Sequence, residues 1–540
     1  MEINGIEDAM RMVALSRRKF IGQGLAAGVS ASALGTLLSA CGGTSGTSAG
    51  TTAVGTPPKV PTGTFTVALA GPPTSLDPGR RLGLGAFYAT EDIYDGLVTF
   101  NHDFTDVVPQ LCESWTVSPD ATEWAGKLRP GMTFHDGTPI DATAIRKNFE
   151  YFLKNAAYLF IPLPLKKIDD SKPDTIRLVF QSPYPYFTRN VTLLKMQSPR
   201  AIAAGPRAID KHPIGSGPMQ FVSSDANTIQ LERFPGYWNK GLPHVEQIKF
   251  VITSDPAARV AALRSGQVNL ATNLAPSEAA QVKSDPRTKL VSKASWVVTT
   301  MNFKLAAPSV HDVRIRQAVA YAIDREAILK SIGGGVGVVA DSLMPPGTEG
   351  YSKMSPAYAY DPAKARELLR AVGGPVAIHM AVPAGDILAN FLVSEAVAQA
   401  IVAQLKNVGI DASVDAIPES QEQKERTELK PPHVAKLSSY TWFTGGPIIY
   451  GFMESDHNMQ QAYPQQYAQY RKLSDQMNAE PDLAKREAII AQIQQIHVDL
   501  LPSIPLFVMP AVDGVSKDVQ GYVPDIRNFG PNLDSVYFAS

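Results

Sequence analysis

The most constraining feature of the sequence is a helix pattern that leads directly into a strand pattern. Apolar residues recur at intervals of four and three from Val397 to Val408, as on one face of a helix, and Gly409 supplies the stop. From Ile410 to Val414 apolar and polar residues alternate, which is the period of a half-buried strand. A helix that feeds a strand in this way is typical of α/β architecture.

Other segments repeat this interleaving. Asp141 and Asp361 are placed to cap two further helices, and Pro362 occupies the first helical position, where its missing N–H costs nothing. Gly373 ends the second of these helices, and Val245–Ile252 has the composition of a strand. We therefore expect mixed α/β lobes. The lack of a short internal repeat argues against a solenoid or a propeller.

Length and charge narrow the class of protein. The 540 residues exceed what one hydrophobic core usually supports, so two or more domains are expected. Lys and Arg number 50 and Asp and Glu number 51, and the lack of a basic patch argues against nucleic acid as a partner. After the N-terminal segment, no stretch approaches the roughly 18 consecutive apolar residues of a membrane span.

The N-terminal segment reads as an export signal. Arg17 and Arg18 precede an apolar stretch, Gly24–Ala40, that is too short for a spanning helix of ~20 strongly apolar residues. The paired arginines resemble a twin-arginine signal, and Leu38–Cys41 resembles the lipobox of bacterial lipoproteins. This resemblance implies a lipid on Cys41 and anchoring at the extracytoplasmic, periplasmic face of a membrane. An ordinary cleaved signal with a chance cysteine stays an alternative.

A linker follows the signal. Residues 42–63 are dense in Gly, Ser, Thr and Pro and have no apolar periodicity, so we expect a flexible tether over residues 41–63 after a signal over residues 1–40. The second cysteine, Cys112, would then have no partner, and the sequence predicts no disulfide framework.

Motifs for nucleophilic catalysis fall where they could not work. The Gly-x-Ser-x-Gly match, Gly46–Gly50, lies in the tether, and the Ser-x-x-Lys match, Ser16–Lys19, lies in the signal. His135 and Asp136 could be an acid/base pair, but Phe134–Pro139 has the composition of a turn that leaves a strand. The sequence therefore favours a protein that is not an enzyme.

Metal and cofactor motifs are also weak. No two of the nine histidines lie at ligand spacing in the sequence, and no metal or cofactor is expected. Glu454, Asp456 and His457 could meet a metal, yet a solvated polar turn is the favoured interpretation. Gly335–Ala340 resembles a dinucleotide fingerprint but follows a helix pattern, so we expect a loop.

A family resemblance becomes specific in the middle of the chain. Several motifs, in order, look like the signature of family 5 extracytoplasmic solute-binding proteins, the dipeptide, oligopeptide and nickel receptors of ABC importers. The resemblance spans about Thr66 to the C-terminus. It is carried by residues 94–98, 108–111, 113–115, 127–137, 214–218, 237–239, 263–269, 313–318, 322–325 and 504–506.

The resemblance implies a two-lobed periplasmic-binding-protein fold (type II, cluster C-like) with the ligand enclosed at a hinge. Lobe I would take residues 64–297 plus 505–540, with an extra subdomain near 85–200, and lobe II would take residues 298–504. The implied partners are a small solute, ABC permease subunits and the membrane, and the implied state is a monomer without covalent chemistry. The alternatives are an extracytoplasmic ligand-sensing or interaction lipoprotein, or an exported hydrolase.

Most motif residues are expected to maintain the fold. Trp115 and Trp238 would pack in cores, whereas Arg314, Arg316 and Asp324 would lie on a solvated or ion-paired helix face. Function must therefore be argued from the cleft.

The resemblance also bears on the ligand. In peptide-binding members an aspartate shortly after a tryptophan pairs with the ligand's α-amino group, and Gly445 stands at that position here. The missing carboxylate argues against a peptide with a free N-terminus, since a buried unpaired ammonium is costly. Amino-blocked peptides, opine-like or sugar-derived compounds, organic acids and metal chelates stay open.

Candidate ligand-binding residues follow from the same correspondence. Arg80 and Arg81 would hold a carboxylate or phosphate if they face the cleft, although an exposed pair is the favoured interpretation. Tyr440, Trp442 and Phe443 would either stack on a ligand or pack in the core. The full set is Arg80, Arg81, Leu82, Asn302, Tyr440, Trp442, Phe443, Thr444 and Gly445.

Overall fold

The computed structural model describes most of the chain after residue 56. It covers residues 57–539 except 59, 81–82, 156–162, 335, 385–394, 419–420, 422–423, 426–427, 429–430, 442–457, 528–529 and 531–532. Across these ranges, no helix has both the length and the apolar character needed to cross a membrane.

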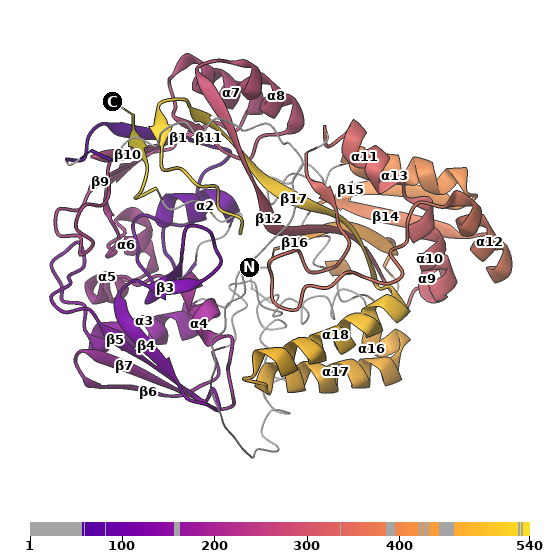
Figure 1. Ribbon diagram of the computed structural model, residues 1–540, viewed down its shortest axis with the longest axis horizontal. Coiled ribbons are helices and arrows are strands. Elements are labelled where there is room, and N and C mark those ends of the chain that lie inside the picture. Colours follow the sequence, from indigo (N-terminus) through magenta and orange to yellow (C-terminus); the bar gives the residue numbers. More distant parts are fainter. Residues whose placement is uncertain are drawn as a thin grey trace, which may run out of the picture.

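One large mixed sheet runs through the molecule (Figure 1). A short strand, β13 (Val338–Val339), pairs with β17 beside the main path. The strands of the main path, in spatial order, are β15 (Asp411–Ile417), β14 (Ala377–Pro383), β16 (Ala435–Thr441), β12 (Thr288–Phe303), β17 (Ser503–Ser516), β11 (Leu270–Ala271), β1 (Thr64–Leu69), β10 (Gln247–Ile252), β9 (Thr228–Arg233) and β8 (Met219–Ser224).

Two strands connect the halves of this sheet. β12 has 16 residues and β17 has 14, and they pair antiparallel from Thr288 opposite Ser516 to Asn302 opposite Ser503. Their register shifts twice, between Ala294 and Val297 and between Thr299 and Thr300, so this ladder is irregular over part of β12. β12 and β17 are called the crossing strands below.

The first lobe surrounds the β1 end of the sheet. Helices α7 (Pro256–Ser265) and α8 (Pro276–Ser284) cover β11, and the C-terminal strands β18 (Val519–Gln520) and β19 (Tyr537–Phe538) return to its core.

A subdomain with its own core projects from the first lobe. It holds α2 (Gly83–Thr90), the hairpin β2–β3 (Val98–Phe100, Val107–Pro109), and a sheet ordered β4 (Cys112–Val117), β5 (Glu123–Leu128), β7 (Thr175–Phe180), β6 (Leu165–Lys172). Its other helices are α3 (Ala142–Asn155), α4 (Phe187–Asn190), the 3-10 turn Val191–Leu193, α5 (Pro199–Ala204) and α6 (Pro206–Lys211).

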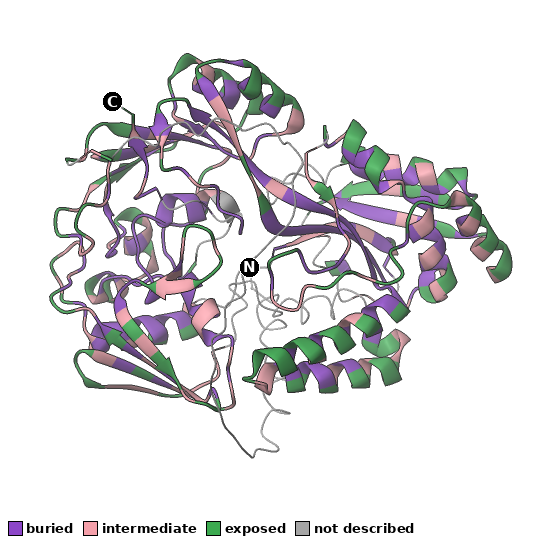
Figure 2. Ribbon diagram, in the orientation of Figure 1, coloured by how far each residue is buried: buried purple, intermediate pink, exposed green. Residues whose placement is uncertain are grey.

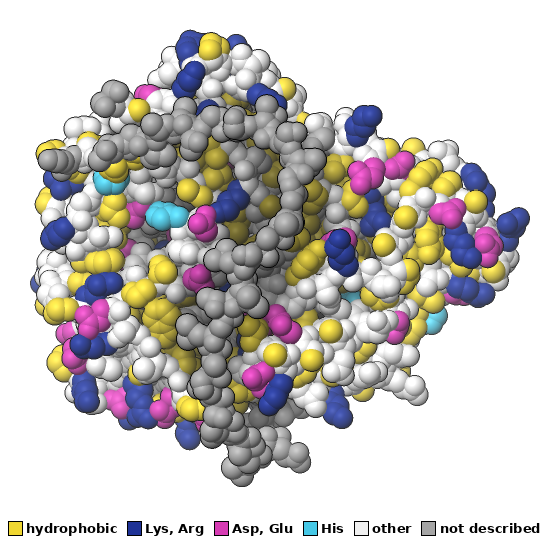
Figure 3. Space-filling view, in the orientation of Figure 1, with side chains coloured by type: hydrophobic (Ala, Val, Ile, Leu, Met, Phe, Trp, Pro, Cys, Tyr) yellow, Lys and Arg dark blue, Asp and Glu magenta, His cyan; other side chains and the backbone are white. Residues whose placement is uncertain are grey.

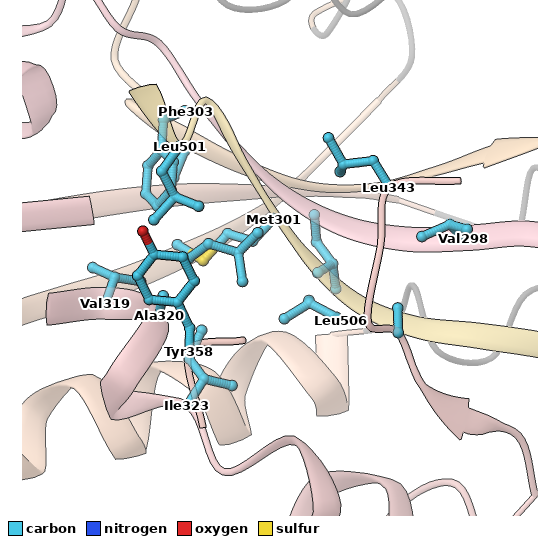
Figure 4. Packing of buried hydrophobic residues seen from close by; sticks show 14 of the residues in the cluster. Val298, Met301, Phe303, Val319, Ala320, Ile323, Leu343, Tyr358, Leu501 and Leu506 are labelled. Carbon is cyan, nitrogen blue, oxygen red and sulfur yellow. The ribbon is translucent and has the colours of Figure 1, made fainter. Parts of the chain in front are cut away.

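The second lobe surrounds β14, β15 and β16. Its core contains Met301, Phe303 and Leu506 of the crossing strands together with Val319 and Tyr358 (Figure 4). The helices are α9 (Pro308–His311), α10 (Val313–Ala322), α11 (Arg325–Ser331), α12 (Pro362–Val372), α13 (Glu395–Asn407), α16 (Met459–Ala462), α17 (Pro464–Ala479) and α18 (Leu483–Leu500). Figure 2 shows that α17 and α18 each keep one buried and one exposed face.

Several local predictions are confirmed. Asp361 Oδ1 accepts a hydrogen bond from the Lys364 amide at 2.9 Å and caps α12. Asp141 caps α3 in the same way, and the predicted helix-to-strand passage is α13 followed by β15. Phe134–Pro139 forms a turn in which Gly137 has φ +77°.

One local prediction is wrong. Arg316, a residue of α10, does not lie on a solvated or ion-paired face, because its side chain is fully buried. Its guanidinium donates to the carbonyl oxygens of Val310, His311 and Leu500 and to the Tyr463 hydroxyl. Its neighbour Arg314 is exposed and ion-paired, as expected. Helical spacing alone could not separate the two, because the buried acceptors come from distant segments.

Candidate functional site

The region where the two lobes meet is the candidate site. The crossing strands pass beneath it, and the surface on this side of the molecule is hollowed near the middle (Figure 3). Of the predicted site residues, Arg80, Asn302 and Tyr440 are described. Arg81, Leu82, Trp442, Phe443, Thr444 and Gly445 lie outside the described residues, as does Cys41.

Arg80 is held by a neighbouring carboxylate. Its Nη1 lies 3.4 Å from Asp210 Oδ2, and its side chain is 44% exposed. Asp210 also accepts hydrogen bonds from the Ser75 hydroxyl and from the Leu76 amide. The arginine is therefore half-exposed, and its guanidinium keeps donors for a further partner because this single pair uses only one side of its fork.

The loop that carries Arg80 is held in place by hydrogen bonds to the buried Asp77 carboxyl. Asp77 is buried, accepts from the Gly79 amide at 2.8 Å and from the Tyr151 hydroxyl, and burial raises the pKa of its carboxyl. A Cβ added at Gly79 would lie 2.6 Å from the Tyr151 ring. The backbone before Arg80 is therefore held in place by contacts within the first lobe and its subdomain.

Asn302 and Tyr440 lie on adjacent strands of the second lobe. Asn302 is 1% exposed, and its Oδ1 accepts from the Ser503 hydroxyl at 2.8 Å and from the Thr300 hydroxyl at 3.0 Å. Tyr440, opposite Val298 on β12, is half-buried and packs against the second-lobe core. Asn302 thus ties the crossing strands together, and Tyr440 contributes to the core at this point.

An aromatic cluster that sequence reasoning missed joins the β2–β3 hairpin to the crossing strand β12. The Trp296 ring on β12 meets Phe100 and Phe104 edge-on, with centroids 5.7 Å and 6.4 Å apart. The Arg527 guanidinium lies over Phe104 at 5.1 Å. These four residues are called the hinge cluster. Only their spacing in three dimensions reveals it, since they come from three distant segments.

A second contact joins the subdomain to the second lobe. The Tyr186 hydroxyl lies 3.5 Å from the Met477 carbonyl oxygen, and the Arg486 guanidinium lies 4.9 Å from the Tyr186 ring. Arg486 is itself held by Glu349 and by the Glu480 carbonyl oxygen. The subdomain and the second lobe therefore touch at a contact separate from the crossing strands.

Comparison with protein families decides what kind of molecule this is. The model of bacterial extracellular solute-binding proteins, family 5 middle, matches residues 106–489. The chain belongs to this family. The resemblance inferred from the motifs is thereby confirmed, and the sequence and structural relatives agree with it.

Curated relatives of this protein include a dipeptide-binding protein and a glutathione-binding protein. The dipeptide-binding protein of Escherichia coli K12 is 26% identical over 471 residues, which cover 80% of this chain and 86% of that protein. The glutathione-binding protein GsiB of Pectobacterium atrosepticum is 28% identical over 358 residues, covering 65% of this chain and 69% of that protein.

Solved structures confirm the two-lobed fold. HbpA2 from Haemophilus parasuis has a TM-score of 0.77 at 22% identity, covering 88% of this chain and 100% of that chain. NikA from Brucella suis, in complex with Fe(III)-EDTA, has a TM-score of 0.79 at 20% identity, with the same coverage of both chains. The predicted α/β, two-lobed fold of this solute-binding protein is therefore correct.

The candidate acid/base pair of this family member has structural roles. His135 is half-buried, its Nε2 lies 3.0 Å from the Gly217 carbonyl oxygen, and desolvation lowers its pKa to about 4. Asp136 accepts from the Ser198 hydroxyl at 2.6 Å and from the Thr138 amide. Each group is thus engaged in holding the turn.

Possible metal ligands come together elsewhere. Within the described ranges, His379, Asp415 and His433 place their ligand atoms within 4.8 Å of one another. The sequence offered no such signal, because the two histidines are 54 positions apart. Pairing of β14 with the neighbouring strands β15 and β16 brings the three residues together. The candidate group Glu454, Asp456 and His457 lies outside the described residues.

Proposed function

We propose that the protein is the solute receptor of an ABC importer. It captures a small polar solute between its lobes and delivers it to the membrane permease. The observation that carries this proposal is the combination of two features: two long strands that run through both lobes, and a separate contact of Tyr186 in the subdomain with Arg486 in the second lobe. A receptor needs both, because a ligand that contacts both lobes can then shift the population toward closure.

The proposed division of the chain follows the crossing strands. Lobe I takes residues 64–297 and 505–540, with the subdomain near 85–200, and lobe II takes residues 298–504. The register shift between Ala294 and Val297 supports a boundary there, since an interrupted ladder bends more readily than a regular one.

The solute is proposed to be peptide-like or another small polar compound without a free α-amino group. Gly445 leaves that group without a carboxylate, whereas Arg80 and Arg81 offer donors to a carboxylate or phosphate. Tyr440, Trp442 and Phe443 would supply an apolar wall. The fold relative AgaA, solved with agropinic acid, supports a solute without that group, whereas the relatives named for glutathione and dipeptides support only the peptide-like character.

The receptor would work outside the cytoplasm on a lipid anchor. A lipid on Cys41 and a tether over residues 42–63 would keep the lobes near the permease, since short flexible linkers give high local concentrations. In this role the protein binds and releases its solute without covalent chemistry.

Native mass spectrometry of the protein, purified gently from an exporting host, tests the proposal. We expect one small molecule per chain, released on denaturation and lacking a free α-amino group. Trp442→Ala should lose this molecule or its affinity, and Tyr360→Ala, at an exposed tyrosine, should keep it.

Two results would count against different parts of the proposal. A bound solute with a free α-amino group would defeat the interpretation of Gly445 and leave the receptor role intact. A protein that is always empty, and that no solute in a broad thermal-shift panel stabilises, would instead favour a sensing or interaction role.

A further inference from the structure

Three side chains converge on the outer part of the second-lobe sheet, away from the lobe junction. His379 is on β14, Asp415 is on the neighbouring edge strand β15, and His433 lies just before β16. In the parallel pairing Asp415 is opposite Ala381, two residues after His379, so the two side chains share a face of the sheet. The Val434 amide donates to the His379 carbonyl oxygen at 2.9 Å, which brings His433 to the same place.

The distances suit a single ion. His379 Nε2 lies 3.1 Å and His433 Nε2 lies 3.4 Å from the same oxygen, Asp415 Oδ2. A tetrahedral ion with bonds of about 2.0–2.2 Å keeps its ligand atoms about 3.3–3.6 Å apart. Both separations are therefore close to those that a shared metal imposes.

His433 is oriented from behind by a buried carboxylate. Its side chain is 4% exposed, and its Nδ1 lies 2.8 Å from Glu425 Oε2. Glu425 is also held by the Gln421 amide, which donates to Oε1 at 2.8 Å. An Nδ1–H that donates to Glu425 leaves the lone pair of Nε2 directed at Asp415, and such a carboxylate–histidine arrangement is the usual support of a metal-bound imidazole.

We propose that His379 Nε2, His433 Nε2 and Asp415 Oδ2 bind one divalent transition-metal ion of the zinc type, with solvent completing the coordination. The mixed imidazole and carboxylate set favours zinc, nickel or copper over calcium or magnesium. The ion has access from solvent, because the side chains of His379 and Asp415 are 38% and 59% exposed. It would join three segments of the second lobe and is separate from the solute proposed above.

Zinc titration of the protein, carrying a tag without histidine and stripped with chelator, tests this site. Calorimetry at neutral pH should give one ion per chain. His379→Ala and Asp415→Asn should each weaken zinc at least about tenfold, and Glu425→Gln about 10–100-fold, because it supports His433. His102→Ala, at an exposed histidine outside the cluster, is the matched control and should bind like the parent.

Cobalt gives a second readout that simple adsorption does not produce. Co²⁺ at the site should show the visible absorption of low-coordinate cobalt, and His379→Ala should lose it while retaining the parent's circular dichroism. Absence of zinc binding, or equal binding by the parent, His379→Ala and Asp415→Asn, would overturn the proposal. Loss in His102→Ala equal to that in His379→Ala would also overturn it.

Discussion

The two lobes bury charge in different ways. In the first lobe, a buried lysine forms an ion pair with a buried carboxylate: Lys195 Nζ lies 3.0 Å from Glu91 Oε2, and both side chains are more than 90% buried. In the second lobe, two buried arginines are held by main-chain oxygens, Arg316 by Leu500 and Arg325 by Pro505 and Tyr358. Another buried arginine of this lobe, Arg486, pairs with the Glu349 side chain. The first arrangement contains carboxyls that titrate, whereas the second contains groups that stay charged at every physiological pH.

This difference teaches which buried charges depend on conditions. Carbonyl oxygens cannot change charge, so Arg316 and Arg325 act as permanent cross-links between segments. The first-lobe carboxyls depend on partners contributed by other segments and on their own protonation. The following substitutions test this contrast, from the largest expected effect to the smallest.

Replacing Arg316 with Met should have the largest effect. Three carbonyl oxygens would lose their donor, at about 1–3 kcal/mol each, so the unfolding free energy should fall by about 5 kcal/mol or more. Urea unfolding followed by circular dichroism measures this change. Arg314→Met, two residues away in an exposed ion pair, should cost no more than about 1 kcal/mol. Equal losses in the two variants would show that Arg316 is not a cross-link.

Lys195→Met should destabilise the first lobe by about 1.5–3 kcal/mol, because it removes the nearer cation from buried Glu91 and leaves Arg527 at 4.0 Å. Adding Glu91→Gln to this variant removes the buried carboxylate and should recover part of the loss. Urea unfolding of the two single variants and the double variant gives the coupling energy. Strictly additive losses would mean that the pair does not stabilise the lobe as a unit.

Asp95→Asn should change how stability responds to pH. Burial raises the pKa of Asp95 from 3.8 to about 7, although hydrogen bonds from Trp238 and Tyr237 oppose the shift. Between these values the folded protein holds a proton that the unfolded chain has released, so the unfolding free energy should fall as pH rises toward 7. The slope from this group is at most about 1.4 kcal/mol per pH unit.

Chemical unfolding at intervals from pH 5 to pH 8 measures this slope. The asparagine variant keeps the side-chain shape but cannot ionise, so its stability should fall less steeply than the parent's in the same buffers. Parallel curves for the two proteins would contradict a raised pKa at Asp95.

Tyr186→Leu should have the smallest effect on stability, because the contact that it weakens lies between the subdomain and the second lobe. It removes the ring beneath Arg486, which is worth about 0.5–1 kcal/mol, and should weaken solute binding by roughly two- to fivefold through a less favoured closed state. Calorimetry with the solute identified by mass spectrometry measures the change. Tyr186→Phe keeps the ring and should bind within about twofold of the parent; the same loss in both variants would assign the effect to the hydroxyl instead.

Local structure was predictable wherever one residue's chemistry decides it. The caps at Asp141 and Asp361 and the helix-to-strand passage at Gly409 follow from side-chain hydrogen bonding and periodicity, and the motifs were sufficient to identify the family. The hinge cluster and the burial of Arg316 were not predictable. In both cases the partners come from segments far apart in the chain, and no local pattern records that pairing.

The contacts of the candidate site residues were not predictable. The family correspondence selected Arg80 and Tyr440, whose part in solute binding stays a prediction, but it gave no sign that Asp210 holds Arg80. His379 and His433 were dismissed as metal ligands because ligand spacing in sequence detects sites on one helix or loop and misses those assembled by parallel strands.

The crossing strands also set an order of assembly. β11 of the first lobe pairs with β17, and the Leu533 amide donates to buried Asp92, so the first lobe contains residues that leave the ribosome last. The second-lobe core comes mainly from one continuous stretch, Trp296 to Met509. The first lobe, whose synthesis begins first, therefore cannot complete its fold until the residues that follow the second lobe have been made. Until its C-terminal residues arrive, its sheet has an open edge, and it is then that the new chain most needs protection from aggregation.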